Sequence, residues 1–337
     1  MAERVVENLN QALHALLADD PGLYLLGEDL VDPHGGAFKV TRGLSTRWPD
    51  RVLSTPLSEG GIVGVAGGLA LAGQRAIVEI MFSDFVALAF DQILNFASKS
   101  TAMYGRAVPM RLVVRCPTGG NRGYGPTHSQ SLQKHFVGIP GLTLREVSPF
   151  HDNRAVLAGM LDSGRPGLLF EDKVLYTGRM YADGVVDELF RYDFLGAEAD
   201  VARVWVDDPE QCDCILVVPG GLAVRAVVVA RELLLRDDIV CQVLVPSRLW
   251  PLDIAALLPA VSRAGRVVVA EESTAGGTWG AELAQAVHSR LWGTLRAPVR
   301  LVHSADSVIP TAAHLERTVL VQNADIHRAV KEVVHGA

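Results

Sequence analysis

The sequence predicts an α/β protein with two doubly wound domains, because short apolar runs alternate with helical patterns in two separate stretches of the chain. The first stretch opens with an amphipathic helix marked by Val6, Leu9, Leu13 and Leu17. We expect its strands at 23–26, 76–80, 110–114, 142–147 and 168–170, an extended segment at 52–56, and helices near 60–72, 84–103, 129–137 and 152–163.

The periodicity fades between residues 176 and 213 into an acidic, irregular stretch. We therefore expect a first domain at 1–190, a linker region at 191–213 and a second domain at 214–337. Strands of the second domain are expected at 215–218, 240–245, 266–270 and 299–302, with helices near 222–235, 252–263, 279–291 and 324–334.

Composition excludes several classes of protein. Hydrophobic residues make up 49% and charged residues 20%, which is typical of a folded globular chain and not of a disordered one. A net charge of -7 argues against a nucleic-acid or anionic-membrane partner. The longest apolar run, 61–73, is shorter than the ~20 residues of a membrane span. The first residues lack a basic region followed by an apolar core, so we expect no secretory signal and a cytoplasmic location.

The 4 cysteines are too few for a disulfide framework in a chain of this length. Cys212 and Cys214 have a C-x-C spacing that metal sites use, but no histidine or third cysteine lies nearby. We therefore expect ordinary thiols.

Two patterns each allow a structural and a chemical interpretation. Ser58 and Glu59 open a glycine-rich helix, where serine caps free amides and glutamate complements the helix dipole. Alternatively, the small residues after Glu59 allow a close approach to a cofactor at which this carboxylate is aimed. Phe82 and Phe85, after a strand, either stack on a planar ring or pack in the core.

The loop from Cys116 to Gln130 carries glycines between a predicted strand and a predicted helix. It is neither a Walker loop nor a dinucleotide fingerprint, because no Gly-Lys-Ser/Thr follows and the glycine spacing differs. His128 stands at the expected helix start, where an imidazole stays neutral and usable as a base or donor near pH 7. The alternative is an exposed loop histidine.

Taken together, several separated motifs resemble the β subunit of thiamine-diphosphate-dependent 2-oxo acid dehydrogenases. The similarity runs in order from about Val5 to Asn323. It rests on Leu25-Leu26-Gly27-Glu28-Asp29, Thr55-Pro56-Leu57-Ser58-Glu59, Glu79-Ile80-Met81-Phe82-Ser83-Asp84-Phe85, Ala89-Phe90-Asp91-Gln92, His128-Ser129-Gln130-Ser131, Val147-Ser148-Pro149 and Ile309-Pro310.

The resemblance implies a pyrimidine-binding transketolase-like domain followed by a transketolase C-terminal domain. It also implies an α2β2 heterotetramer in which the α subunit supplies the diphosphate and magnesium site. The family's Gly-Asp-Gly diphosphate motif is absent from this sequence. We therefore expect the chain alone not to hold thiamine diphosphate.

The resemblance also implies roles for individual residues. Glu59 would hydrogen-bond the aminopyrimidine ring of the cofactor and favour the tautomer that removes the thiazolium proton. Phe85 would pack on the pyrimidine and Leu57 would line the same pocket. His128 would orient the 2-oxo acid and assist acyl transfer to a lipoyl group. For Glu28 and Asp91 we expect ordinary surface or interface carboxylates.

The sequence departs from the family at two places. Pro126 and Thr127 precede the histidine where many relatives carry other pairs, and Arg122 and Tyr124 add bulk and charge, so the identity of the 2-oxo acid stays open. Ser163 stands where some relatives have an aspartate that helps to hold a structural potassium ion, so that ion stays open too.

The leading hypothesis is an enzyme subunit that decarboxylates a 2-oxo acid and passes the acyl group to a lipoyl-bearing acyltransferase. The first alternative keeps the cofactor and the decarboxylation but uses another acceptor, as a carboligase of a biosynthetic pathway does. The others are a transketolase-type sugar enzyme, which shares the domain pair, and a non-catalytic scaffold, which the presence of Glu59, Phe85 and His128 together disfavours.

Overall fold

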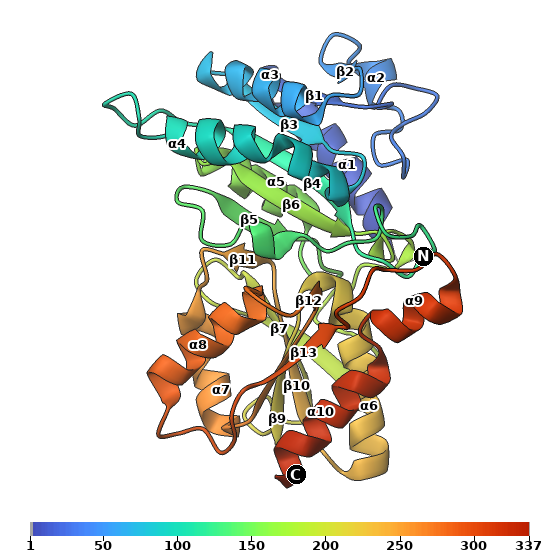
Figure 1. The fold of residues 1–337 in the computed structure, drawn as a ribbon, viewed down its shortest axis with the longest axis vertical. Coiled ribbons are helices and arrows are strands. Elements are labelled where there is room, and N and C mark those ends of the chain that lie inside the picture. The colour runs from blue at the N-terminus through green and yellow to red at the C-terminus, as the bar shows by residue number, and fades with distance from the viewer. Residues whose placement is uncertain (1–2, 337) are drawn as a thin grey trace. The chain divides into compact units, whose positions relative to one another are not determined.

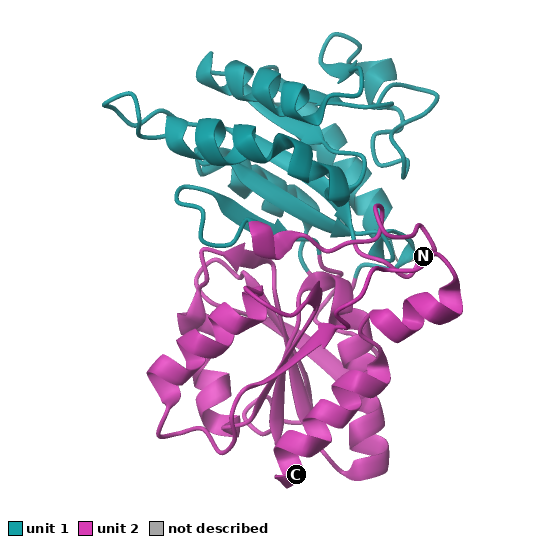
Figure 2. Cartoon of the chain, in the orientation of Figure 1, with its two compact units in different colours: residues 1–118, 136–147, 151–180 teal, residues 119–135, 148–150, 181–337 magenta. Residues whose placement is uncertain are grey.

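The computed structural model describes residues 3–336. The chain divides into two compact units (Figure 2). Unit 1 comprises Met1–Thr118, Phe136–Val147 and His151–Met180, and unit 2 comprises Gly119–His135, Ser148–Phe150 and Tyr181–Ala337. The segment 119–135, which carries His128, therefore folds with the second unit although it lies within the first part of the sequence.

Unit 1 contains a parallel sheet with the strand order β5-β6-β4-β3-β1-β2. Its strands are β1 (Leu23–Gly27), β2 (Val52–Ser54), β3 (Arg75–Glu79), β4 (Leu112–Thr118), β5 (Thr143–Glu146) and β6 (Gly167–Asp172). The helices α1 (Val5–Asp19), α3 (Glu59–Leu71) and α5 (Asn153–Asp162) flank it, with α2 (Leu44–Arg47) and η4 (Leu175–Thr177) as short additions (Figure 1). These elements confirm the predicted parallel α/β fold.

Two of the expected helices, 84–103 and 129–137, are not regular α-helices in the structure. The expected helix 84–103 is a 3₁₀ helix η1 (Ser83–Ala89), a π helix η2 (Gln92–Ala97) and one turn α4 (Ser98–Ser100). Here Phe96 packs so closely on α3 that a Cβ at Gly67 would lie 2.4 Å from the ring. The contact between Phe96 and Gly67 thus lies in the π-helical part of this segment.

The expected helix 129–137 is reduced to the 3₁₀ turn η3 (Gln133–His135). Ser129 and Ser131 favour turns over helix because their hydroxyl groups compete for backbone hydrogen bonds. His128 therefore does not stand at a helix start.

Unit 2 contains a mixed sheet with the order β13-β12-β9-β10-β8-β7. Its strands are β7 (Phe190–Leu195), β8 (Val201–Val206), β9 (Cys214–Val217), β10 (Cys241–Pro246), β12 (Val267–Thr274) and β13 (Arg300–Ser304), and β11 (Arg248–Trp250) follows β10. The helices are α6 (Ala223–Asp237), α7 (Leu258–Ala264), α8 (Trp279–Leu291), α9 (Ala313–Val319) and α10 (Asn323–His335), with the turns η5 (Gly220–Leu222) and η6 (Ile254–Ala256) (Figure 1).

The segment 191–213, which we expected to be a linker, contains most of β7 and all of β8. These strands form an antiparallel hairpin in which Phe190 and Tyr192 are buried while Arg191 is exposed. Charged residues on the outer face conceal this period-2 alternation within an acidic stretch. The sheet of unit 2 therefore has two antiparallel strands, β8 and β7, at one edge, which the sequence pattern did not predict.

A buried ion network, made of Glu79, Arg115, Glu171 and Tyr176, crosses the sheet of unit 1. Arg115 donates from Nη1 to Glu79 (2.6 Å), from Nε to Glu171 Oε1 (2.7 Å) and from Nη2 to Glu171 Oε2 (2.8 Å). The Tyr176 hydroxyl donates to Glu171 over 2.6 Å. Burial raises the pKa of Glu79 although Arg115 opposes that shift. This network joins β3, β4 and β6 through charged hydrogen bonds.

Within residues 3–336, no helix combines the length and the apolar character that crossing a membrane requires.

Candidate cofactor and catalytic residues

Glu59 is the first residue of α3 and is partly exposed. The structural interpretation of this helix start required a capping hydrogen bond from the Ser58 side chain, but that side chain makes none. The backbone N–H of Ser58 instead hydrogen-bonds the carboxylate of Glu28. The start of α3 is thus tied to the end of β1, and the Glu59 carboxylate lies near a second acidic group.

Glu28 is not the surface carboxylate that we expected. Its side chain is 5% exposed at the carboxyl end of β1, and Oε1 has no hydrogen-bond partner among the described residues. Burial, and then the negative charge of Glu59, raise the pKa of Glu28. Asp91, by contrast, is exposed as expected, and it accepts a hydrogen bond from Asn95.

Leu57 and Phe85 lie in unit 1 with Glu59. Leu57, two residues before Glu59, is 79% exposed, which is unusual for a leucine in a folded unit. Phe85 lies in η1 and meets Phe82 edge to face, with ring centroids 6.3 Å apart. η1 packs against α3, since a Cβ at Gly60 would lie 3.1 Å from the Leu88 carbonyl oxygen. The elements that carry Phe85 and Glu59 are therefore neighbours within one unit.

The small residues of α3 form two faces. Gly60, Gly64 and Gly67 face Leu88, Gln92 and Phe96 within the unit. Close packing explains Gly60 and Gly67, whereas a Cβ at Gly64 would meet Gln92 only at an ordinary contact distance of 3.9 Å. Along the adjoining side of the helix, Gly61, Val65 and Gly68, with Ala72 at the C-cap, are exposed. We call these four residues the exposed α3 stripe. A Cβ at Gly68 would meet nothing within 4 Å, and Val65 is 59% exposed.

His128 lies in unit 2, in a bend of the loop that begins at Gly119. The hydroxyl of Thr127 lies 3.0 Å from Nδ1 of its partly exposed imidazole. This contact, and not a helix N-terminus, lies beside the ring. The structure thus collects Leu57, Glu59 and Phe85 in one unit and holds His128 in the other.

A cavity of about 560 Å³ lies in unit 2, beside the loop that follows His128 and at the carboxyl ends of β12 and β13. Lys134 in its wall donates to the Thr274 carbonyl oxygen (3.0 Å) and hydroxyl (2.9 Å). Burial and the neighbouring Lys134 charge lower the pKa of His135, which also lines this cavity. Sequence reasoning missed this lysine–threonine contact because the two residues are 140 positions apart.

Residues 3–336 contain no group of three or more His, Cys, Asp or Glu side chains arranged to hold a metal ion. Burial raises the pKa of Cys212 to about 12, which favours the thiol over the thiolate that metals bind. Cys214 is buried beside Cys241 in the neighbouring strand. These thiols behave as packing residues.

Ser163, where we left a structural potassium ion open, is engaged by its own neighbours. Its hydroxyl donates to the Met160 carbonyl oxygen (2.7 Å) and accepts from the Arg165 N–H (3.1 Å). The Ser163 hydroxyl is therefore already hydrogen-bonded on both sides, and the residue brings no negative charge for a cation.

Comparisons with known proteins agree over nearly the whole chain. The transketolase pyrimidine binding domain model matches residues 4–178, and the transketolase C-terminal domain model matches residues 202–326. The pyruvate dehydrogenase E1 component subunit beta-2, mitochondrial, of Oryza sativa is 32% identical over 99% of this chain and 86% of its own length.

Bacterial relatives give the same result. The β subunit of acetoin:2,6-dichlorophenolindophenol oxidoreductase from Cupriavidus necator is 31% identical and covers 97% of this chain and 96% of its own length. The pyruvate dehydrogenase E1 component subunit beta of Leifsonia xyli is 35% identical over 91% of this chain and 88% of its own. Among solved structures, a split-gene transketolase described as an inactive β4 tetramer has a TM-score of 0.71 at 18% identity and covers 99% of both chains, which shows the shared fold.

Proposed function

The chain belongs to the transketolase-like family of β subunits of 2-oxo acid dehydrogenase E1 components, and we propose that with an α subunit it decarboxylates a 2-oxo acid and passes the acyl group to a lipoyl carrier. The observation that carries this proposal is the pair of carboxyl groups at the start of α3. Glu59 stands at the helix N-terminus, and the buried Glu28 lies close enough to feel its charge.

The carboxyl pair fits the aminopyrimidine part of thiamine diphosphate. Oε1 of Glu28 is buried and has no hydrogen-bond partner within residues 3–336, and a polar group bound beside Glu59 would relieve that cost. Exposed Leu57 and the Phe85 ring supply apolar surface for a flat heterocycle. When bound, thiamine diphosphate supplies the electron sink for loss of carbon dioxide from a 2-oxo acid.

The two carboxyl groups divide the work. The raised pKa of Glu28 means that this group keeps a proton more readily than an exposed glutamate does. A proton on Glu28 removes the repulsion between the two groups and leaves Glu59 to accept a hydrogen bond from a ring nitrogen. Glu59 thereby sets which ring nitrogen of the cofactor carries a proton. It acts as an indirect general acid–base group, through the cofactor ring and not on the substrate itself.

The exposed α3 stripe supports an α subunit as the partner. Gly61, Val65, Gly68 and Ala72 recur at helical spacing and leave an apolar surface on which a second helix packs closely. The sequence lacks the family's diphosphate motif, so we propose that the α subunit brings the magnesium and diphosphate site. The isolated chain should then show no thiamine diphosphate binding by calorimetry, and co-expression with the α subunit should restore it.

For His128 we propose orientation of the 2-oxo acid and assistance in acyl transfer. The Thr127 hydroxyl lies 3.0 Å from Nδ1, which leaves the second ring nitrogen of the imidazole to face the substrate.

Glu59→Gln tests the central assignment. The chain is co-expressed with its genomic α partner and assayed against a panel of 2-oxo acids with an artificial oxidant. We expect turnover to fall ~100-fold or more with the complex still assembled, because the amide no longer stabilises the protonated ring nitrogen. Glu282→Gln, which alters an exposed first-turn glutamate of α8, is the matched control and should leave turnover unchanged. Turnover near wild type in Glu59→Gln would show that this residue only starts a helix.

His128→Ala tests the acceptor. We expect it to reduce transfer to a lipoyl domain more than decarboxylation measured with the oxidant, since both assays share the earlier steps. Equal losses would assign the histidine to binding or structure. A complex that decarboxylates but accepts no lipoyl domain would favour the carboligase alternative.

A further inference from the structure

The glycine loop, residues 119–125, leads to His128 and has an unusual backbone. Gly119, Asn121, Gly123 and Gly125 all have positive φ angles, between 64° and 84°. Such a path is open to glycine and tolerated by asparagine. It turns successive backbone N–H groups of the loop toward one region of unit 2.

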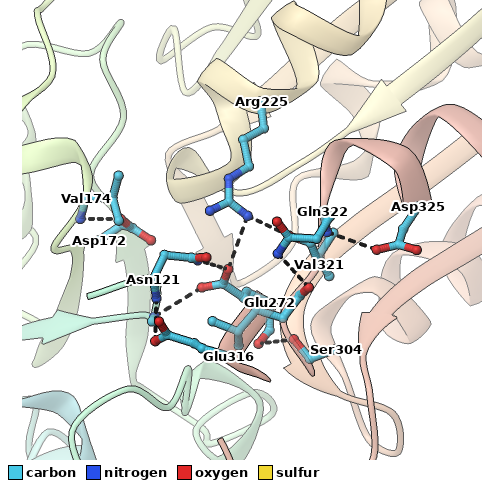
Figure 3. Close-up of polar contacts among 12 residues, drawn as sticks. Asn121, Asp172, Val174, Arg225, Glu272, Ser304, Glu316, Val321, Gln322 and Asp325 are labelled. Atoms are coloured by element: carbon cyan, nitrogen blue, oxygen red, sulfur yellow. Dashed lines mark hydrogen bonds and ion pairs between the residues drawn. The ribbon is translucent and has the colours of Figure 1, made fainter. Parts of the chain in front are cut away.

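Two of these N–H groups end on Glu316, a side chain that is 2% exposed in α9. Oε1 accepts from the Asn121 N–H (2.8 Å), and the Gly123 N–H lies 3.4 Å from Oε1 and 3.2 Å from Oε2 (Figure 3). A buried carboxylate needs such donors, and charged hydrogen bonds are stronger than neutral ones. Glu316 therefore clamps the middle of the glycine loop.

Glu272, at the carboxyl end of β12, holds the beginning of the same loop. Oε2 accepts from the Gly120 N–H (3.3 Å) and Oε1 accepts from the Asn121 side-chain amide (2.9 Å). Arg225 lies 3.6 Å from Oε1 and also donates to the Val321 carbonyl oxygen (Figure 3). The Arg225 charge thus compensates a carboxylate whose side chain is 8% exposed.

The glycines allow the loop to lie directly on the segment 311–320. A Cβ at Gly120 would lie 2.3 Å from Leu320 Cδ1, and one at Gly125 would lie 2.7 Å from Thr311 Oγ1. The glycine pattern of this loop is therefore explained by contact with the chain itself and not by a phosphate cradle. A larger side chain at Gly120 requires the loop or the buried Leu320 side chain to move.

We propose that Glu316 and Glu272 are positioning residues, which fix the glycine loop and through it place the His128 imidazole for acyl transfer. This inference rests on the proposed function, because it gives His128 a task in the reaction. Only two residues, Pro126 and Thr127, separate Gly125 from His128, so movement of the clamped backbone moves the ring. A displacement of the His128 ring by about 1 Å lowers the rate of the step that it assists, even though Glu316 and Glu272 touch no substrate.

The test combines hydrogen exchange of the full chain with activity of the complex. In Glu316→Gln, one acceptor oxygen becomes an amide that faces backbone N–H groups, so peptides covering 119–128 should exchange at least ~10-fold faster. In the complex with the α subunit, transfer to a lipoyl domain should fall ~10-fold or more relative to decarboxylation with an artificial oxidant. Glu316→Asp, which keeps the charge on a shorter side chain, should restore part of both losses.

Asp325→Asn is the matched control. Asp325 also accepts a backbone N–H bond, from Gln322 at the start of α10, but it does not contact the loop (Figure 3). We expect it to leave loop exchange and the ratio of the two activities unchanged. If Glu316→Gln does not fold, Gly120→Ala gives the same test with both carboxylates intact, because its Cβ meets Leu320.

Unchanged exchange in the Glu316 and Gly120 variants would overturn the clamp. Faster exchange with an unchanged ratio of transfer to decarboxylation would overturn the positioning role. A wild-type complex that decarboxylates no 2-oxo acid would instead refute the proposed function, while the exchange experiment would still report whether the two carboxylates hold the loop.

Discussion

Arg115→Met is the sharpest test of the buried ion network. Arg115 is fully buried, and its three hydrogen bonds to Glu79 and Glu171 measure 2.6–2.8 Å. Methionine fills most of the same space but leaves two buried carboxylates without their cation. Removing one partner of a buried ion pair costs about 3–5 kcal/mol, far more than the net contribution of the intact pair.

The size of the effect also has a pH dependence. Burial already raises the pKa of Glu79 with Arg115 present, and loss of the arginine raises it further. A carboxyl group with a raised pKa in the folded state favours folding below its unfolded-state pKa and loses that advantage as the pH rises. The destabilisation by Arg115→Met should therefore be larger at pH 8 than at pH 5.

Equilibrium urea unfolding, followed by circular dichroism, measures the loss, and thermal unfolding should shift by roughly 6–20 °C at about 2–4 °C per kcal/mol. Arg300→Met is the control. It removes an exposed pair with Glu332 (2.9 Å), which should contribute about 0–1 kcal/mol. A loss below about 1 kcal/mol for Arg115→Met, or a loss independent of pH, would refute the account of the network.

Three further predictions follow from single features of the structure. Gly68→Leu should abolish co-purification with the α subunit at little cost to the stability of the chain. A Cβ at this position meets nothing within 4 Å in the chain's own fold, but a leucine would block a partner from packing on the exposed α3 stripe. Undiminished co-purification would place the partner elsewhere. Replacing potassium by sodium should leave the melting temperature within about 1 °C, since the Ser163 hydroxyl already engages the Met160 carbonyl oxygen; a clear potassium-specific rise in melting temperature would contradict this. Glu28→Gln should stabilise the isolated chain at pH 8 by about 1 kcal/mol and have little effect at pH 4. Burial raises the pKa of Glu28, so the folded state loses stability as the pH rises through that pKa, and glutamine removes this loss. Urea unfolding at the two pH values measures the difference, and a loss of stability at pH 8 would contradict a raised pKa for Glu28.

Local patterns determined much of the fold. The apolar runs expected as strands at 23–26 and 215–218 coincide, to within a residue, with β1 (Leu23–Gly27) and β9 (Cys214–Val217). Buried parallel strands are apolar on both faces, a property that each run carries by itself. The helix 279–291 was expected at the limits that the structure shows, since its apolar residues recur at helical spacing. The motifs around Glu59 and His128 likewise lie in short stretches of sequence, which is why the family resemblance was readable.

The tertiary structure alone decided the environments of these residues. Glu28 was expected as a surface or interface carboxylate but is buried, and its carboxylate accepts a hydrogen bond from the Ser58 N–H at the start of α3. Asn121 and Glu316 are 195 positions apart, and no local pattern predicts that a loop amide and a helix carboxylate will meet. Arg115 interrupts an apolar strand, and only the packing of β3 and β6 on either side shows that two carboxylates compensate it. Burial and charge compensation depend on which distant segments come together, and that is a property of the folded chain rather than of any window of its sequence.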